Sequence, residues 1–253
     1  MIRRSLVYLL LVFCFFSCKE KGLDTKLIAS KYYQGVVKIL LMDPEGEKIE
    51  PGKGYLGRGS GFIVTEDGYL FTNKHVVEMC VKGYVDYNYL EDTEELNSVA
   101  VYSEDLLINP ALTKVNRTGH SIPIVQVYNG TGENDYKLYI AEVVSIGSGS
   151  YDGAMLKIVS DLEGKPVRKK FKTVPLGNSD DVAQGENLCV YGYPAQFGGS
   201  AALMLKDLST ISLGIMSGYD YVFNEDYGYL KTDAEIHPGN SGGPVFSEEN
   251  KVI

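Results

Sequence analysis

A serine near the C-terminal end of the sequence stands among glycines, in a pattern that could turn its hydroxyl group into a nucleophile. Residues 232–244 read TDAEIHPGNSGGP. A serine attacks a carbonyl group efficiently only when a base removes its proton and backbone N–H groups stabilise the resulting oxyanion. Gly239, Gly242 and Gly243 lack Cβ atoms, so the backbone can turn tightly and aim N–H groups at one point. We predict Ser241 as the nucleophile; for this motif alone, a polar turn between strands is the alternative.

A serine nucleophile needs a histidine base that lies near it in space, and one of the three histidines has a suitable context. His75 follows GSGFIVTEDGYLFTNK, which is typical of two strands joined by a turn at residues 66–68. His120 lies in a polar stretch, and His237 is close to Ser241 in the chain, but neither has such a context. We therefore predict His75 as the base.

An aspartate that could orient this histidine stands at the entrance to a predicted strand. In YDGAMLKIVS, Asp152 precedes Ala154, Leu156 and Ile158, which alternate with other residues as in a half-buried strand. A carboxylate at the mouth of such a strand is well placed to hold an imidazole. The alternative is an ordinary turn aspartate at a strand entry.

Taken together, these motifs resemble the trypsin-like serine peptidases of chymotrypsin fold, and especially their bacterial HtrA (Deg-like) branch. Four segments match in the family's order: GSGFIVTEDGYLFTNKHVVE, YDGAMLKI, VPLGNSDDVAQGENLCVYGYP and LKTDAEIHPGNSGGPVF. The order His, Asp, Ser is that of chymotrypsin. The resemblance covers residues 59–246 in patches, and the joint occurrence of the four segments is more specific than any one of them.

The resemblance implies an all-β fold with two six-stranded antiparallel β-barrels and an active site in the cleft between them. It also implies that His75 is the general base, Asp152 its orienter and Ser241 the nucleophile. The N–H groups of Gly239 and Ser241 would form the oxyanion hole. Such an enzyme cleaves protein or peptide substrates through an acyl-enzyme, needs no cofactor, and in some cases assembles into homo-oligomers.

The same alignment of motifs places Glu235, six positions before Ser241, at the base of the pocket for the substrate's P1 side chain. A buried carboxylate there would favour a basic P1 residue. A glutamate that points to solvent or accepts a backbone hydrogen bond is the alternative.

Domain boundaries follow from the spacing of the matched segments. We expect the N-terminal barrel at residues 35–165, with an insertion at about 80–149, because the histidine and aspartate segments lie further apart than is usual in HtrA-type enzymes. Tyrosine-rich alternating pieces indicate extra hairpins in this insertion. We expect the second barrel at residues 166–253. Only the opening of the strand that should follow the serine loop is present, so we expect this barrel to be incomplete and the chain nearly inactive as it stands.

Residues 1–17 have the pattern of an export signal, with Arg3 and Arg4 before an apolar run that ends at Phe16. Cys18 follows Phe-Phe-Ser, which resembles the lipobox of bacterial lipoproteins. That resemblance implies cleavage before Cys18, lipid attachment to its thiol, and a location in the cell envelope outside the cytoplasm. Residues 18–34 would form a tether. A plain signal peptide or an uncleaved anchor is the alternative.

The net charge bears on the classes of partner that the chain can bind, and the cysteine content bears on disulfide formation. With 33 acidic and 24 basic residues, the net charge of −9 disfavours binding to nucleic acid. We interpret the basic run Arg168, Lys169 and Lys170 as a solvated connection between the barrels. Cys80 and Cys189 could form a disulfide after export or remain as buried thiols, and the sequence leaves both options open.

Two functions of different kinds fit the sequence. The first is a serine endopeptidase, which the intact catalytic residue types favour. The second is a catalytically weak lipoprotein of protease fold that acts as a surface binding protein, since a fold does not fix a function. An esterase or transferase that uses the same three residues cannot be distinguished from the first by sequence.

Overall fold

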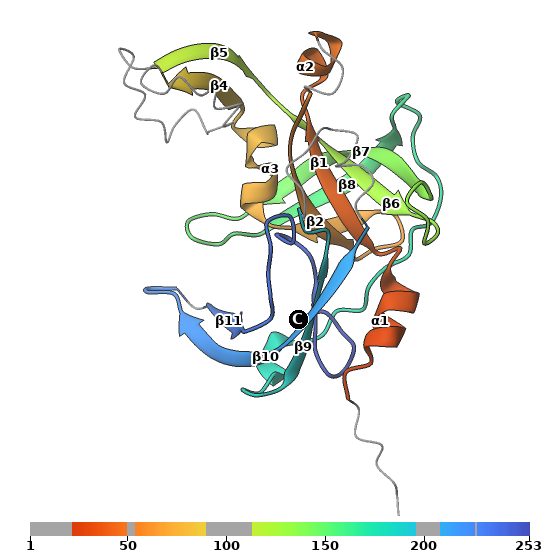
Figure 1. Cartoon of the computed structure of the whole chain (residues 1–253), viewed down its shortest axis with the longest axis vertical. Coiled ribbons are helices and arrows are strands. Elements are labelled where there is room, and N and C mark those ends of the chain that lie inside the picture. The colour runs from red at the N-terminus through yellow and green to blue at the C-terminus, as the bar shows by residue number, and fades with distance from the viewer. Residues whose placement is uncertain (1–21, 50–53, 90–112, 196–207, 226) are drawn as a thin grey trace, which may run out of the picture.

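Six antiparallel strands from the N-terminal two-thirds of the chain close into a barrel (Figure 1). The computed structural model describes residues 22–49, 54–89, 113–195, 208–225 and 227–253. Around the barrel the strand order is β1-β2-β3-β8-β7-β6. The strands are β1 (Val36–Met42), β2 (Tyr55–Ile63), β3 (Tyr69–Thr72), β6 (Ile122–Tyr128), β7 (Tyr136–Ile146) and β8 (Ala154–Asp161). The chain is therefore mostly β, with a closed six-stranded barrel as predicted.

Strand β1 is buried on both faces because it contributes to two hydrophobic cores. Val37 and Ile39 point into the barrel, where they pack in a cluster with Leu70 and Leu156. Val36 faces the opposite way and belongs to the second cluster, between the barrel and the second half of the chain. Because successive side chains of a strand alternate between its faces, a run such as VVKILLM is expected where both faces are covered. Each fully buried aliphatic side chain contributes about 1.5–3 kcal/mol.

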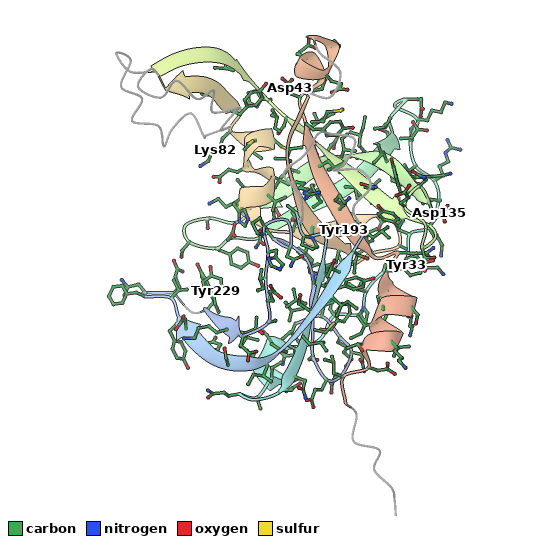
Figure 2. All side chains as sticks on the ribbon, in the orientation of Figure 1. Tyr33, Asp43, Lys82, Asp135, Tyr193 and Tyr229 are labelled. Carbon is green, nitrogen blue, oxygen red and sulfur yellow. The ribbon has the colours of Figure 1, made fainter. Side chains whose placement is uncertain are left out.

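In the second half of the chain the described residues form an open four-stranded sheet in the order β11-β10-β9-β12. Its strands are β9 (Asn187–Gly192), β10 (Thr210–Tyr221), β11 (Gly228–Thr232) and β12 (Val245–Phe246), and a short 3-10 helix, η1 (Ser179–Asp181), precedes β9. Tyr193 follows β9 and lies where this sheet meets the barrel (Figure 2). Its ring stacks on Tyr128 at a centroid distance of 5.8 Å, and its hydroxyl donates to the Val36 carbonyl at 3.2 Å. The two halves are thus joined by packed aromatic side chains.

Part of the expected tether is instead a helix packed on the second core. Helix α1 (Thr25–Tyr32) begins after Asp24, whose carboxylate accepts a hydrogen bond from the Leu27 N–H, as an N-cap does. Ile28 is fully buried, and Tyr32 stacks on Phe246 with centroids 5.5 Å apart. Residues 22–34 are therefore fixed beside the second sheet (Figure 1).

The region of the expected insertion contains both barrel strands and an extra hairpin. Strands β6 and β7 complete the barrel, whereas β4 (Tyr84–Tyr89) and β5 (Thr113–Gly119) pair in a separate two-stranded sheet. Residues 90–112 lie outside the described residues. A short helix, α2 (Pro44–Ile49), lies between β1 and β2, and α3 (Lys74–Val81) follows β3. Among the described helices, none is long and apolar enough to cross a membrane. The predicted signal and Cys18 fall on residues that are not described.

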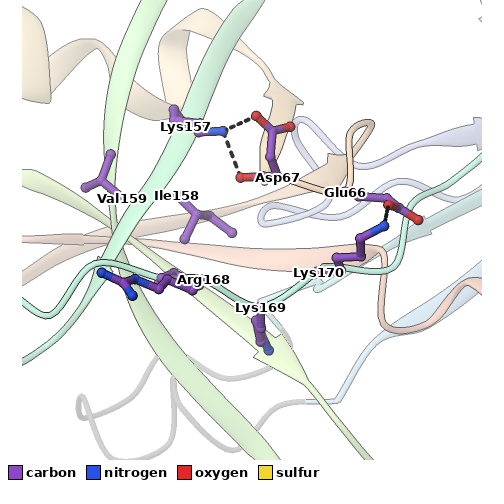
Figure 3. A pocket seen from close by; sticks show the side chains of 9 residues that line it. Glu66, Asp67, Lys157, Ile158, Val159, Arg168, Lys169 and Lys170 are labelled. Carbon is purple, nitrogen blue, oxygen red and sulfur yellow. Dashed lines mark hydrogen bonds and ion pairs between the residues drawn. The ribbon is translucent and has the colours of Figure 1, made fainter.

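The basic run at residues 168–170 lies against the outside of the first barrel, where it lines a hollow (Figure 3). The Lys170 ammonium group is 2.6 Å from a Glu66 carboxylate oxygen. Lys169 Nζ lies 4.8 Å from the ring centroids of both Tyr139 and Phe171, and desolvation lowers its pKa. All three residues of the run are exposed, so the run lies at the solvated surface of the connection between the halves.

Cys80 and Cys189 are free thiols in separate places. Cys80 is on α3 and packs against the barrel core, whereas Cys189 on β9 is fully buried in the second cluster. Desolvation raises the pKa of each thiol to about 11; a hydrogen bond with Ser121 partly opposes this shift for Cys80. Buried thiols of this kind are poor nucleophiles at neutral pH.

We predict that neither thiol of the folded protein is alkylated readily at pH 8. With a pKa of about 11, roughly a thousandth of each thiol is thiolate at that pH. Peptide mass spectrometry after a timed iodoacetamide pulse would measure modification of Cys80 and Cys189, with denatured protein as the control. Fast alkylation of the folded chain, or a peptide pair linked through the two cysteines, would contradict this prediction.

Candidate active site

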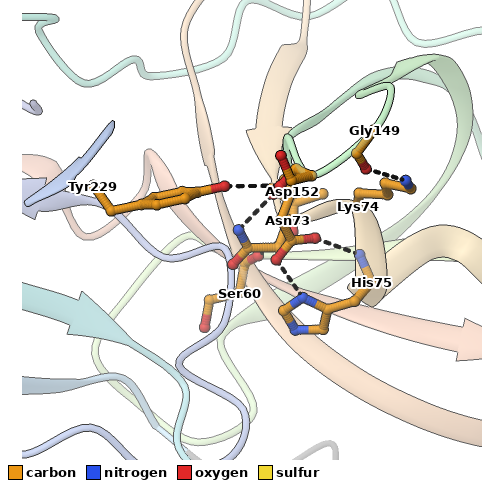
Figure 4. Close-up of polar contacts among 9 residues, drawn as sticks. Ser60, Asn73, Lys74, His75, Gly149, Asp152 and Tyr229 are labelled. Atoms are coloured by element: carbon orange, nitrogen blue, oxygen red, sulfur yellow. Dashed lines mark hydrogen bonds and ion pairs between the residues drawn. The ribbon is translucent and has the colours of Figure 1, made fainter. Parts of the chain in front are cut away.

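The structure brings His75 and Asp152 into direct contact (Figure 4). His75 Nδ1 is 2.6 Å from Asp152 Oδ2, and the His75 backbone N–H donates to Asp152 Oδ1 at 2.9 Å. The pairing of β3 with β8 causes this contact, because it aligns Thr72 with Ala154 and so brings the residues just beyond each strand end together. One carboxylate therefore binds both the ring and the backbone of the same histidine.

Asp152 also completes the N-terminus of the helix that carries the histidine. The first N–H groups of an α-helix have no partner within the helix. At α3, the Lys74 N–H donates to the Asp152 carbonyl at 3.2 Å, and the His75 N–H donates to the Asp152 carboxylate. The N-cap residue Asn73 makes no side-chain cap; its amide instead donates to the Asp152 carbonyl at 2.7 Å. The carboxylate thus lies at the electropositive end of the helix.

The His75 and Asp152 side chains are 50% and 40% exposed, respectively. At such exposure, solvent screens the attraction between the two groups, and a pair of this kind adds little to stability. The contact therefore matters for the orientation of the imidazole, which two hydrogen bonds to one carboxylate define. Nδ1 faces Asp152, so the other ring nitrogen, Nε2, lies on the side of the ring away from this carboxylate.

The serine loop is attached to the first barrel at Ser60. The Ser60 N–H donates to the Ser241 carbonyl at 2.8 Å. The buried Ser60 hydroxyl donates to the Gly239 carbonyl at 2.7 Å and accepts from the Tyr193 N–H at 2.8 Å. A Cβ on Gly59 would lie 2.6 Å from Val76, so only glycine permits this close approach of strand, loop and helix.

The glycine after the serine lies against the segment that leads to His75. Gly242 has φ +83°, and a Cβ there would lie 2.2 Å from Thr72 Oγ1 and 2.8 Å from the Asn73 nitrogen. A side chain at this position is excluded by both the dihedral angle and the lack of space. Ser241 is thereby held beside the junction between β3 and α3, which carries His75.

The two N–H groups predicted for the oxyanion hole have no acceptor among the described residues. Hydrogen bonds from Asn240 to the His237 carbonyl and from Gly243 to the Asn240 carbonyl shape the turn. The Pro238 carbonyl accepts from the Ala195 N–H. Because carbonyl and N–H point in opposite directions across a trans peptide, the Gly239 N–H is directed away from Ala195.

A cleft of about 980 Å³ runs past this site between the two halves of the chain. The first half contributes Asn73 and Asp152 to its lining, and the second half contributes Gly242 and Ile236. Among the described residues, no three His, Cys, Asp or Glu side chains are grouped so that they could hold a metal ion.

Of the alternatives for Glu235, the structure shows a glutamate that points to solvent and not a buried pocket carboxylate. Its side chain is 78% exposed, and its carboxylate lies 3.1 Å from His237 Nε2. An unpaired buried carboxylate is costly, whereas His237, two positions later, offers a partner at the surface. The sequence also did not reveal two residues that position the site, Ser60 and Asn73. A small polar residue between Gly59 and Gly61 in a strand was the available signal for Ser60.

Comparisons with known proteins agree on one family. Residues 59–253 match the model of the trypsin-like peptidase domain. The chain is 28% identical over 197 residues to a "Probable periplasmic serine endoprotease DegP-like" of Halomonas elongata, covering 77% of this chain and 28% of that protein. It is 25% identical over 213 residues to a protein of the same description from a Marinomonas species, with 83% and 32% covered. The chain thus spans about a third or less of these relatives.

Solved structures share the fold. The crystal structure of Deg5 superposes with a TM-score of 0.56 at 20% identity and covers 91% of this chain and 85% of its own. The HtrA-type protease AlgW with a tripeptide gives a TM-score of 0.54 at 20% identity, with 91% and 53% covered. At 20% sequence identity, this similarity shows that the chain shares a chymotrypsin-like fold with these structures.

We predict that Ser60→Ala lowers the free energy of unfolding by about 1–3 kcal/mol, because it leaves the buried Gly239 carbonyl and Tyr193 N–H without their partner. Denaturant titration would measure the change. Ser30→Ala is the control, because Ser30 lies on the exposed part of α1, where alanine favours the helix. Equal stability of the two variants would show that the Ser60 bridge does not hold the serine loop.

Proposed function

The chain belongs to the trypsin-like peptidase family, and from that membership we propose that it is a serine endopeptidase that cleaves protein or peptide substrates. The observation that carries the proposal is the double contact of Asp152 with the ring and backbone of His75. Relatives described as periplasmic serine endoproteases support the activity and a location outside the cytoplasm. The substrate would bind in the cleft between residues 35–165 and residues 166–253.

In the proposed mechanism, His75 Nε2 takes the proton from the Ser241 hydroxyl as its oxygen attacks the peptide carbonyl. Asp152 keeps the imidazole in the required orientation and stabilises its cationic form. The N–H groups of Gly239 and Ser241 stabilise the oxyanion of the tetrahedral intermediate. The protonated His75 then gives its proton to the departing amine, which leaves an ester between Ser241 and the acyl half of the substrate. Water repeats the same steps and releases the acid.

The alternative, a surface binding protein of protease fold, lacks a supporting observation of its own. A binding protein needs neither an oriented imidazole nor backbone donors without acceptors next to a serine. A fluorophosphonate probe separates the two functions, because it reacts covalently only with an activated serine.

We predict that, in the full-length protein, Ser241→Ala and His75→Ala each reduce hydrolysis of an unfolded protein substrate by about 10⁴-fold or more, with the fold retained. The double variant should be no worse than the poorer single one, because the two residues act as a unit. Asp152→Asn should lose somewhat less, about 10³–10⁴-fold. Initial rates and circular dichroism would measure activity and fold.

His120→Ala is the matched control, because it removes a histidine outside the cleft. It should keep wild-type hydrolysis and probe labelling. If Ser241→Ala still hydrolysed substrate at the wild-type rate, or if the losses of the single variants added up in the double variant, the proposed roles would be wrong.

We also propose that Cys18 becomes the mature N-terminus and carries a lipid that anchors the protein to a membrane. The basic residues, the apolar run and the cysteine that follow one another in residues 1–18 support this proposal.

Mass spectrometry of the N-terminal peptide from the membrane fraction should show a diacylglyceryl adduct on Cys18. Cys18→Ser should release the protein from that fraction, whereas Cys14→Ser, within the predicted signal, should not. An unmodified N-terminus at another residue would contradict the anchor and leave the peptidase proposal untouched.

A further inference from the structure

The loop that carries Asp152 is held from two sides. Residues 147–153 connect β7 to β8. On one side the loop contacts α3 through the hydrogen bonds of Asp152. On the other side it contacts strand β11 of the second sheet: the Tyr229 hydroxyl donates to the Ser150 carbonyl at 2.8 Å (Figure 4).

Aromatic rings extend this second contact. The hydroxyls of Tyr227 and Ser150 are 2.8 Å apart. The rings of Tyr227 and Tyr151 meet edge to face with centroids 5.7 Å apart, and those of Tyr227 and Tyr229 do so at 6.1 Å. Edge-to-face pairs are favourable beyond their buried area. Tyr227 and strand β11 after it therefore contact the residues immediately before Asp152 through both hydroxyl groups and rings.

The loop itself has few means to hold its shape. It contains Gly147, Gly149 and Gly153, and glycine has the greatest backbone freedom in the absence of outside contacts. Gly149 has φ +57°, which favours glycine at that position. Two backbone hydrogen bonds lie within the loop, from Gly147 to the Gly153 carbonyl and from Tyr151 to the Ser148 carbonyl. Contacts from outside are thus needed to fix the position of Asp152.

Tyr229 is suited to this task by its chemistry. Desolvation, together with the neighbouring Tyr227, raises its pKa, so its hydroxyl remains a proton donor at neutral and mildly alkaline pH. Its acceptor is a backbone carbonyl, which is present whatever side chain stands at residue 150. The bond crosses from the second sheet to the first barrel and ends two residues before Asp152.

We propose that Tyr229 is a positioning residue of the active site: its hydrogen bond to the Ser150 carbonyl fixes the loop that holds Asp152 against His75. This inference rests on the proposed peptidase function. Tyr229 does not contact the reacting atoms; it acts through the carboxylate. The imidazole is therefore held in this orientation only when the hairpin of β10 and β11 is ordered.

Tyr229→Phe tests the proposal, because it removes one oxygen and keeps the ring. We expect kcat to fall about threefold to tenfold, the worth of one neutral hydrogen bond, with KM unchanged. The wild type should show a deshielded NMR resonance for the proton on His75 Nδ1, and in Tyr229→Phe this resonance should broaden or disappear. Tyr221→Phe is the matched control: the same substitution in the same hairpin, at a residue that is 85% exposed. It should leave rate and resonance unchanged.

A double-mutant cycle separates positioning from a general structural effect. With Asp152→Asn as the background, Tyr229→Phe should have almost no further effect, because the group through which it acts is gone. Equal losses in both backgrounds, or wild-type kcat and an intact Nδ1 resonance in Tyr229→Phe, would overturn the inference. Such results leave the peptidase proposal standing. Failure of the full-length wild-type protein to react with a fluorophosphonate probe would instead contradict the peptidase proposal, while the NMR comparison would still test the contact itself.

Discussion

The contact between Asp152 and the start of α3 is the interaction on which the candidate site depends. A helix that begins at a cleft exposes unpaired N–H groups, and a carboxylate that approaches them also approaches the side chains of the first turn. Here the carboxylate meets the second residue of the helix, which is His75. The end of the helix and the direction of the imidazole are therefore fixed by a single group.

The serine loop is brought to this pair by the packing of the two halves rather than by the helix. Ser60 lies in a barrel strand, yet its hydroxyl bridges Gly239 in the loop and Tyr193 behind β9. Burial makes the bridge effective, because each of its partners would otherwise lose a hydrogen bond away from water. The stacked rings of Tyr193 and Tyr128 hold the second sheet against the barrel around this bridge. The hydrogen-bond geometry at the cleft thus depends on the packing of apolar side chains behind it.

Much of this arrangement could be predicted from the sequence because the signals are local. Strand alternation before His75 and after Asp152, and the glycines around Ser241, identified the three segments that the structure brings to one cleft. Barrel strands β6 and β7 were assigned to the insertion because alternation is the same in a barrel strand and in an added hairpin. The exposure of Glu235 depends on its pairing with His237, and the roles of Ser60 and Tyr229 depend on contacts distant in sequence. The Tyr229 contact has no local signature, whereas the glycines beside Ser60 and the nearness of His237 to Glu235 are weak local signals.

Because the His75–Asp152 pair is exposed, contacts other than the attraction between its charges must fix the orientation of the imidazole. In a dry interior, the attraction between a carboxylate and an imidazolium would hold the geometry; with 50% and 40% of the side chains exposed, it is largely screened. Orientation then comes from the hydrogen bonds that the Asn73 side-chain amide and the Lys74 and His75 N–H groups donate to Asp152, and from the contacts of the glycine-containing loop 147–153. Those contacts reach into the second sheet. The geometry of His75 and Asp152, which belong to the first barrel, is therefore set in part by the half of the chain that carries Ser241.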